Sequence, residues 1–487
     1  MVHVTDFPET TTGDLIESPQ TGKPPIPAMT QRVVLLLALP IIGENLLQTA
    51  VGAVDTLLVS RIGDDAIAGV GVGAELVFFM LAILSAVTVG ATVLVSQAIG
   101  SGNKERSNQL ARQAITWGIL IAIPLSIVGY FATPALVGLF GAEPQVTEYA
   151  ISYFQVIAST SVFLLLSFLC GAVLRGAGDS RTPLKAAILA NIVNIFLSYA
   201  LIFGHLGLPE LGVAGSAWGA SIGRGIAAAF MLVMLWRGKG PLSIHGKSGW
   251  RPERRVGKDL FRLGGPAAIE QGMMEAGFMS LVMIVATLGT AALAAQQISF
   301  TAMSLGFLPS IGFAVTATAL VGQSIGARRI DDAITAFRIS LRWSIVWMAA
   351  GLVLYVFAAE WMIKLFSSDP DVIAAGTGGL RAIGLSLPLW GIWMTSAGSL
   401  RGSGDTRSPM VRGVITVWLA VVLAFVGVHW FDMGIGWVWL TFLITSPISA
   451  VGNIRAFRRR SEELRREFAL NPNPDTPEPI PVPVYQP

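Results

Sequence analysis

Twelve apolar runs of membrane-spanning length divide this chain, and they restrict its fold more than any other feature. A transmembrane helix needs about 20 consecutive apolar residues, and hydrocarbon leaves every backbone polar group to be paired within the segment. The runs cover approximately residues 33–58, 74–99, 112–133, 150–173, 185–204, 212–236, 263–287, 294–322, 340–359, 376–399, 410–430 and 434–455. The sequence therefore predicts an all-α integral membrane protein with twelve transmembrane helices, in contact with the lipid bilayer.

The composition excludes several other classes of protein. Only 13% of the residues are charged, whereas a soluble protein usually has about 25%. A net charge of +3 is too small to favour nucleic-acid binding. The single cysteine, Cys170, lies in an apolar run, and the four histidines are scattered, so neither a thiol metal site nor an enzyme's dense polar constellation is expected. We expect no cofactor, and no enzymatic activity.

The connections between the runs alternate in charge. One set is nearly free of Lys and Arg, for example FGAEPQVTEY and SSDPDVIAAG. The other set is basic and contains Lys104, Arg106 and Arg112; Arg175, Arg181 and Lys185; Arg251, Arg254, Arg255 and Lys258; Arg328 and Arg329; Arg401, Arg407 and Arg412; and the stretch RAFRRR. Basic connections stay in the cytoplasm, so both termini are predicted to be cytoplasmic.

The chain contains an internal repeat at an offset of 226 residues. LRGAGDSRTP at 174–183 returns as LRGSGDTRSP at 400–409, and VSQAIG at 95–100 returns as VGQSIG at 321–326. Six helices per half is an even number, so the halves have the same orientation and should be related by a pseudo-twofold along the membrane normal, with the substrate path between them.

The repeat divides the chain into five predicted parts. They are a disordered N-terminal tail (1–28), an N-terminal six-helix bundle (29–240), a cytoplasmic linker (241–261), a C-terminal six-helix bundle (262–460), and a charged then Pro-rich tail (461–487).

The repeated ten-residue motif is interpreted as a cytoplasmic corner between helices, although contact with substrate is an alternative. Its glycines permit a tight turn at a helix end. Thr182–Pro183 and Ser408–Pro409 have the composition of an N-cap followed by a first-turn proline.

Together these motifs resemble the multidrug and toxic compound extrusion (MATE) family, including its NorM-like and DinF-like branches. The resemblance rests on the six-plus-six arrangement, P-x-x-x-E in the first and seventh helices, VDT in the first, V-x-Q-x-I-G ending the second and eighth, and the LRGxGD corners. It covers roughly residues 30–460. It implies a monomeric antiporter that exports cationic amphiphilic compounds in exchange for H⁺ or Na⁺ by alternating access between two bundles.

Ionisable residues inside the spans are candidates for this chemistry, because each costs at least ~2.5–3.5 kcal/mol at a helix centre. Glu44, Gln48 and Asp55 lie on one face of the first helix, since eleven residues correspond to a rotation of about 20°. Asp55 matches the aspartate that the family uses for coupling. A proton and a cation can compete for one such carboxylate, and this competition is the physical basis of antiport.

The fifth helix carries the amides that the resemblance places beside Asp55. Asn194 matches the family's second asparagine, but Ser198 stands where the DinF-like branch has aspartate. Asn194 and Ser198 are therefore predicted as neutral partners of Asp55, with a Na⁺ ion near Asp55 and Asn194 as an alternative to a proton. Asn191, one turn earlier, is assigned to the substrate cavity.

Arg224, in the sixth helix, also needs a partner, which we expect among Glu44, Asp55 and Glu75. Pairing with Asp55 would favour proton coupling over Na⁺ coupling.

The seventh helix offers two acids. Glu270 is the repeat counterpart of Glu44 and is favoured as a coupling residue together with Glu44. Glu275 lies near the level at which NorM-like relatives carry a functional glutamate, and it is placed with Gln48, Asn191 and Arg224 in the substrate cavity. The tenth predicted helix, 376–399, contains no acid, in contrast to NorM-like relatives.

Other transport functions remain open at this stage. A flippase for lipid-linked precursors, or a small-metabolite exporter of the same superfamily, would be favoured by a basic central cavity. A channel fits less well, because paired P-x-x-x-E motifs in two halves suit alternating access.

Overall fold

The computed structural model of the protein describes residues 28–238, 240–246 and 248–470. The predicted N-terminal tail lies almost entirely outside these residues, and so does the Pro-rich end of the C-terminal tail. All regular secondary structure in the described part of the chain is helical. Eleven of these helices are long and apolar enough to cross a membrane, or up to twelve if one bent pair counts as a single span. The predicted all-α fold with twelve spans is confirmed.

The helices form two lobes. The N lobe contains α1 (Gln31–Val59), α2 (Asp64–Gly100), α3 (Lys104–Gly138), α4 (Pro144–Ser159), α5 (Ser161–Gly176), α6 (Arg181–Phe203), the short η1 (His205–Gly207) and α7 (Val213–Arg237). The C lobe contains α8 (Arg254–Ala286), α9 (Thr290–Gly326), α10 (Ile330–Phe357), the short α11 (Ala359–Lys364), α12 (Pro370–Gly402), α13 (Arg407–Phe431) and α14 (Ile435–Leu470).

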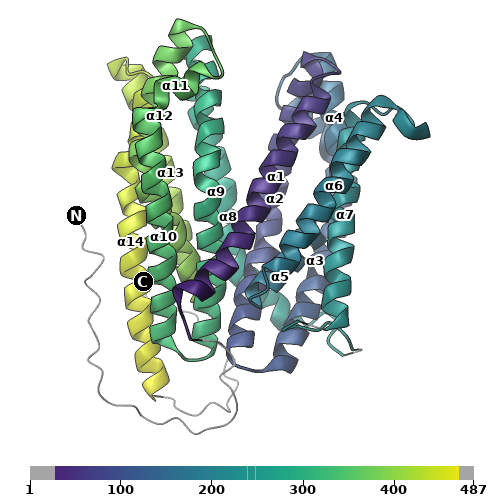
Figure 1. The fold of residues 1–487 in the computed structure, drawn as a ribbon, viewed down its shortest axis with the longest axis vertical. Helices are drawn as coiled ribbons and strands as arrows, with labels where there is room; N and C mark the ends of the chain where they lie inside the picture. The colour runs from purple at the N-terminus through teal and green to yellow at the C-terminus, as the bar shows by residue number, and fades with distance from the viewer. Residues whose placement is uncertain (1–27, 239, 247, 471–487) are drawn as a thin grey trace.

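The lobes diverge from one another like the arms of a V (Figure 1). At the narrow end, α2 packs against α8 and α9, while α1 packs against α9. The connections at the narrow end are the basic ones, so we call it the inner end. The other end, where α1 meets α2 and where α11 lies, is the outer end (Figure 1).

The fourth predicted span, 150–173, is broken into α4 and α5 with a bend of 56°. The break falls at Thr160, whose hydroxyl donates to the carbonyl of Val156 (2.7 Å) and contacts the Ser221 hydroxyl (2.8 Å). A threonine that bonds back to the preceding turn competes with the helical ladder and bends it. The equivalent helix of the C lobe, α12, is continuous.

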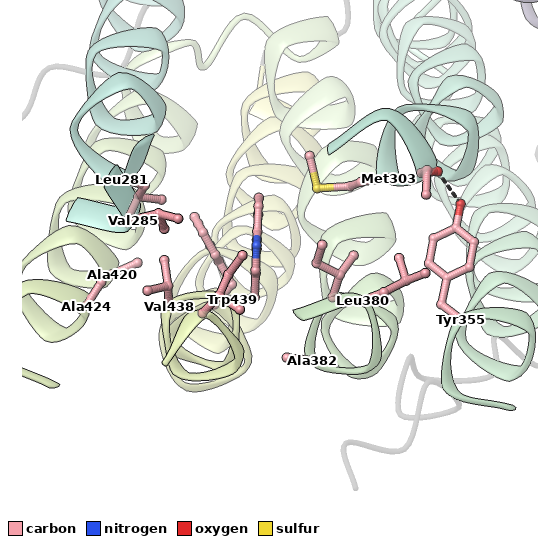
Figure 2. Packing of buried hydrophobic residues seen from close by; sticks show 14 of the residues in the cluster. Leu281, Val285, Met303, Tyr355, Leu380, Ala382, Ala420, Ala424, Val438 and Trp439 are labelled. Atoms are coloured by element: carbon pink, nitrogen blue, oxygen red, sulfur yellow. Dashed lines mark hydrogen bonds between the residues drawn. The ribbon is translucent and has the colours of Figure 1, made fainter. Parts of the chain in front are cut away.

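Large apolar side chains fill the middle of the C lobe. In Figure 2, Leu281 and Val285 of α8 face Val438 and Trp439 of α14. Further along the same core, the Tyr355 hydroxyl donates to the carbonyl of Ala302, so its polar end is satisfied inside the apolar cluster. The lobe is thus a packed bundle with its own core.

The repeated corner motif forms a turn in both lobes, as predicted. Gly178 and Gly404 have φ angles of 88° and 87°, in the left-handed region that glycine tolerates. The predicted N-caps, Thr182 and Ser408, are wrong, because α6 and α13 already begin at Arg181 and Arg407, so that Ser180 and Thr406 occupy the N-cap positions.

The capping group is instead the aspartate of the motif. Asp179 accepts hydrogen bonds from the backbone N–H groups of Arg181 and Thr182, both at 3.0 Å. Asp405 accepts from the backbone N–H of Ser408 at 3.0 Å. A carboxylate at this position satisfies free N–H groups and opposes the positive end of the helix dipole.

The segment between the lobes is held on α3. Arg112 is buried and donates to the carbonyls of His245 (3.1 Å) and Ser248. Gln113 donates to the carbonyls of Gly249 (2.8 Å) and Arg251 (2.6 Å). At the other end of the chain, α14 continues through residues 461–470, which the sequence places in the charged tail.

Candidate functional site

Asp55 of α1 lies at the centre of a polar cluster inside the N lobe. Its Oδ2 atom accepts a hydrogen bond from Asn194 Nδ2 at 3.0 Å, and Asn194 Oδ1 accepts from the Ser198 hydroxyl at 2.9 Å. Asn194 and Ser198 are both buried on α6. The predicted grouping of these three residues therefore exists in the structure.

The other carboxylate oxygen of Asp55 makes no direct hydrogen bond within the described part of the chain, although the Ser198 hydroxyl lies near enough to the carboxylate to interact with it. Oδ1 is buried and has no hydrogen-bond partner among the described residues. A buried acceptor that is left unpaired costs about 1–3 kcal/mol. This oxygen is therefore suited to bind a proton, a water molecule or a cation.

Arg224 of α7 lies within electrostatic range of Asp55, and so does the Tyr153 ring of α4. One guanidinium nitrogen, Nη1, is buried and has no hydrogen-bond partner in the described part of the chain. Of the three carboxylates expected to partner Arg224, only Asp55 interacts with it electrostatically, and the two do not form a direct ion pair. Tyr153 was missed, because a lone tyrosine in an apolar run carries no sequence signal.

Three glycines of α7, spaced four residues apart, bring this cluster together. A Cβ added at Gly215 would overlap the backbone of α6 at Leu201, and one at Gly219 would overlap Ser198. A Cβ at Gly223 would lie 2.7 Å from the Ala190 carbonyl oxygen. Small residues at this spacing let two membrane helices approach closely. Arg224 and the polar residues of α6 are therefore held next to one another by the α6–α7 contact.

Glu44 and Glu270, the repeat-related glutamates, have the same kind of partner in each lobe. Glu44 accepts from Arg175 Nη1 at 3.0 Å, and Glu270 accepts from Arg401 at 2.7 Å. Both arginines belong to the LRGxGD corners. These side chains are mostly shielded, with exposures of 13% and 14% for the Arg175–Glu44 pair and 25% and 3% for the Arg401–Glu270 pair. The arginine partners were not anticipated from sequence.

The remaining predicted residues lie outside the Asp55 cluster. Gln48 is exposed on α1, and Asn191 on α6 has a buried, unpartnered amide nitrogen. Glu275 of α8 accepts from Gln271 at 2.8 Å and lies within electrostatic range of Glu75 on α2. The acids Glu75 and Glu275 therefore influence one another electrostatically across the two lobes.

The cluster has few of the oxygen ligands that a metal ion needs. Across the described residues, no group of three or more His, Cys, Asp and Glu side chains could hold a metal. Asp55 is the one carboxylate of its cluster, and Arg224 adds a positive charge beside it.

Comparisons with known proteins agree with this architecture. The MatE family model matches residues 40–200 and again 266–426, and these stretches begin and end at the offset of the internal repeat. A probable multidrug resistance protein NorM from Thermotoga maritima is 31% identical over 414 residues, covering 84% of this chain and 88% of that protein. The multidrug resistance protein PmpM of Pseudomonas aeruginosa is 26% identical over 452 residues, covering 89% and 94%.

Solved structures share the fold. A transporter of the MOP superfamily from Pyrococcus furiosus, described as having a binding pocket of reverse polarity, superposes with a TM-score of 0.84 at 22% identity, covering 89% of this chain and 96% of that one. An outward-facing MATE family multidrug transporter superposes with a TM-score of 0.83 at 22% identity, covering 90% and 97%. The family match spans both halves of the chain, so this protein belongs to the MatE (multidrug and toxic compound extrusion) family and is a multi-pass membrane transporter, not an enzyme.

Proposed function

We propose that this transporter exports cationic amphiphilic compounds in exchange for protons, and that Asp55 carries the proton. The observation that supports this most strongly is the buried, unpartnered Oδ1 of Asp55, next to an Oδ2 held by Asn194. Protonation neutralises the carboxylate and removes its attraction for a cation. Binding and release of the proton can then alternate with release and binding of the substrate.

Protons are favoured over Na⁺ because of Arg224. The guanidinium within electrostatic range of Asp55 repels any added cation, so Na⁺ would need several oxygen ligands to be held there, whereas a proton forms a covalent O–H bond with a single carboxylate oxygen. Ser198 replaces the second carboxylate that a metal site would need. No cofactor takes part in this scheme.

The remaining polar residues are assigned secondary roles. The substrate path would be lined by Gln48, Asn191, Arg224 and Glu275. Protonation of Glu44 or Glu270 would weaken the ion pair that each forms with its arginine partner. The names of the relatives, which include multidrug resistance proteins, support drug export. The basic connections at the inner end support an inner-membrane location with cytoplasmic termini. We propose that the monomer is the working unit.

A transport assay tests the proposal. Purified protein in proteoliposomes is given a fluorescent cationic dye and either a pH gradient or a Na⁺ gradient. The wild type should move dye under the pH gradient only, and Asp55→Asn should abolish this movement. Asp65→Asn, an exposed carboxylate at the outer end of α2, is the matched control and should transport normally. Dye movement by Asp55→Asn, or movement driven by Na⁺ alone, would contradict the proposal.

A second candidate is export or flipping of compounds with an anionic group. The buried, unpartnered nitrogen of Arg224 supports it, since that group attracts anions once Asp55 is protonated. Under this alternative, no cationic dye would move under either gradient, whereas an anionic amphiphile would be transported by the wild type and not by Arg224→Gln.

A further inference from the structure

The two most closely repeated motifs of the chain meet between the lobes at the inner end. Gln97 of the VSQAIG motif lies on α2, and its Nε2 atom donates to the carbonyl of Gly402 in the opposite LRGSGD corner at 3.0 Å. Gln323 of the VGQSIG motif lies on α9 and donates to the carbonyl of Gly176 in the LRGAGD corner at 2.8 Å. Each lobe thus gives one donor and one acceptor.

These two hydrogen bonds are related by the pseudo-twofold. Gln97 and Gln323 are separated by the repeat offset of 226 residues, and so are Gly176 and Gly402. Both glutamines are 4% exposed, so the bonds are shielded from solvent. A shielded hydrogen bond is strengthened, and its loss leaves a buried carbonyl unsatisfied.

Close backbone contacts surround the bonds. A Cβ added at Gly100 would overlap the backbone oxygen of Gln323, and one added at Gly326 would overlap the backbone oxygen of Gln97. The final glycine of each V-x-Q-x-I-G motif therefore allows the opposite helix to approach. Motif, hydrogen bond and glycine contact are present twice, once on each side of the axis.

Each bond lies next to an intralobe ion pair. Gly176 follows Arg175, which binds Glu44, and Gly402 follows Arg401, which binds Glu270. The Gly176 and Gly402 carbonyls, which accept the glutamine hydrogen bonds, therefore directly follow arginines that bind glutamates of α1 and α8.

We propose that Gln97 and Gln323 form a reciprocal latch that holds the inner ends of the lobes together, and that inward opening breaks both bonds. The symmetry requires each glutamine to contribute equally. In this outward-diverging structure the latch is closed. Once the lobes separate at the inner end, water satisfies the four groups, so the latch opposes opening without preventing it.

The test measures the distance between the outer ends of the lobes, with no substrate or gradient. Spin labels are attached at Asp65→Cys and Asp371→Cys, both exposed and on different lobes, in a Cys170→Ala background. Pulsed electron–electron double resonance in lipid nanodiscs then gives the populations of long (outward-open) and short (outward-closed) distances between the two labels. Because the readout does not depend on transport, its failure is separate from failure of the proposed function.

Gln97→Ala and Gln323→Ala should each raise the ratio of short to long distances about tenfold, and the double variant more. Gln296→Ala is the matched control. Gln296 lies on α9, is also 4% exposed, and accepts from Trp439 Nε1 at 3.0 Å within its own lobe. It should leave the ratio unchanged. Wild-type populations in both single variants, or an equal change in Gln296→Ala, would overturn the latch.

A second measurement applies if the alanine variants fold poorly. A Cβ added at Gly322 would lie 3.0 Å from the Cβ of Ser96, so a small separation of α2 and α9 would bring Ser96→Cys/Gly322→Cys into the ~3.5–4.5 Å range of a disulfide across the same contact. In a Cys170→Ala background without spin labels, oxidation should stop transport, and reduction should restore it. An oxidised, cross-linked protein that still transports at the rate of the reduced protein would show that the inner ends do not separate there.

Discussion

At the scale of single residues, function depends on which buried charge has a partner. Glu44 and Glu270 each bind a corner arginine, whereas Asp55 is held by a neutral amide and keeps one oxygen free among the described residues. The first predicted helix carries Glu44 and Asp55 on one face, yet they lie in different environments. This difference gives them different expected responses to substitution.

Replacing Glu44 should destabilise the protein through its partner. Glu44→Ala leaves the guanidinium of Arg175 shielded and unpaired, which should lower the unfolding free energy by about 3 kcal/mol. Glu44→Ala/Arg175→Ala should recover much of this loss, as measured by thermal unfolding in detergent. Glu360→Ala, which removes an exposed ion pair with Lys364, is the control and should not change the melting temperature measurably. Equal losses in the single and double variants would mean that the pair is not the cause.

Arg224 should determine whether Na⁺ can serve as the coupling ion for transport. If its charge repels Na⁺ from Asp55, then Arg224→Gln should let a Na⁺ gradient drive dye efflux that the wild type does not perform. The measurement is the proteoliposome assay, with Arg237→Gln, in the last turn of α7, as the control for a loss of positive charge. Continued insensitivity of Arg224→Gln to Na⁺ would show that another feature excludes the ion.

Only part of the Asp55 site could be predicted from the sequence. Asp55 and Asn194 were grouped because they match family residues on two helices, and Ser198 because it occupies the position of a family aspartate; the structure brings the three together. Tyr153 and the arginine partners of the glutamates were missed. Contacts between residues far apart in the sequence depend on helix rotation and packing, which a hydropathy pattern does not specify.

At the scale of helices, glycines determine how closely the lobes approach. A Cβ at Gly264 of α8 would overlap the backbone of Ala86 on α2, whereas the neighbouring Gly265 has no atom within 4 Å of its added Cβ. The two glycines are adjacent in one helix but differ in what they face.

This difference predicts opposite effects of the same substitution. Gly264→Ala should destabilise the α2–α8 contact by about 1–3 kcal/mol because of overpacking, while Gly265→Ala should be neutral or stabilise by up to about 1 kcal/mol. Thermal unfolding of both variants provides the comparison. Equal melting temperatures for the two variants would contradict the packing described for this interface.

Helix boundaries were predictable only where the apolar pattern changes. The sequence predicted one span at 150–173, but the Ser159–Thr160–Ser161 stretch breaks it, since the Thr160 hydroxyl competes with the backbone ladder. The corner motif was correctly predicted as a turn from its glycines, while its capping residue was assigned to the threonine and serine instead of the aspartate. The bend within this span and the capping role of the aspartate both depend on side-chain hydrogen bonds that composition does not distinguish.

At the scale of the whole molecule, the repeat and the alternating charge of the connections gave most of the architecture in advance. The six-plus-six division, the parallel pseudo-symmetry and the span count follow from hydropathy and an offset of 226 residues. The bend between α4 and α5 and the cross-lobe glutamine bonds could not be predicted in this way, because they depend on side-chain contacts between helices.

Orientation in the membrane can be tested with single cysteines. In a Cys170→Ala background, a cysteine at Glu105, in the first turn of α3 at the inner end, should be labelled only by a membrane-permeant thiol reagent in intact cells. A cysteine at Asp371, at the outer end, should be labelled also by an impermeant reagent. The reverse pattern would place the termini outside and would invert the transport direction argued here.

The central claim is that a proton and a cationic substrate compete for Asp55, and proton release on substrate binding tests it most directly. Purified protein in weakly buffered detergent is mixed with a saturating cationic dye, and the released protons are counted with a pH indicator. The account predicts about one proton per bound cation for the wild type and for Asp65→Asn, and none for Asp55→Asn. Equal release from Asp55→Asn, or dye binding by the wild type without release, would contradict it.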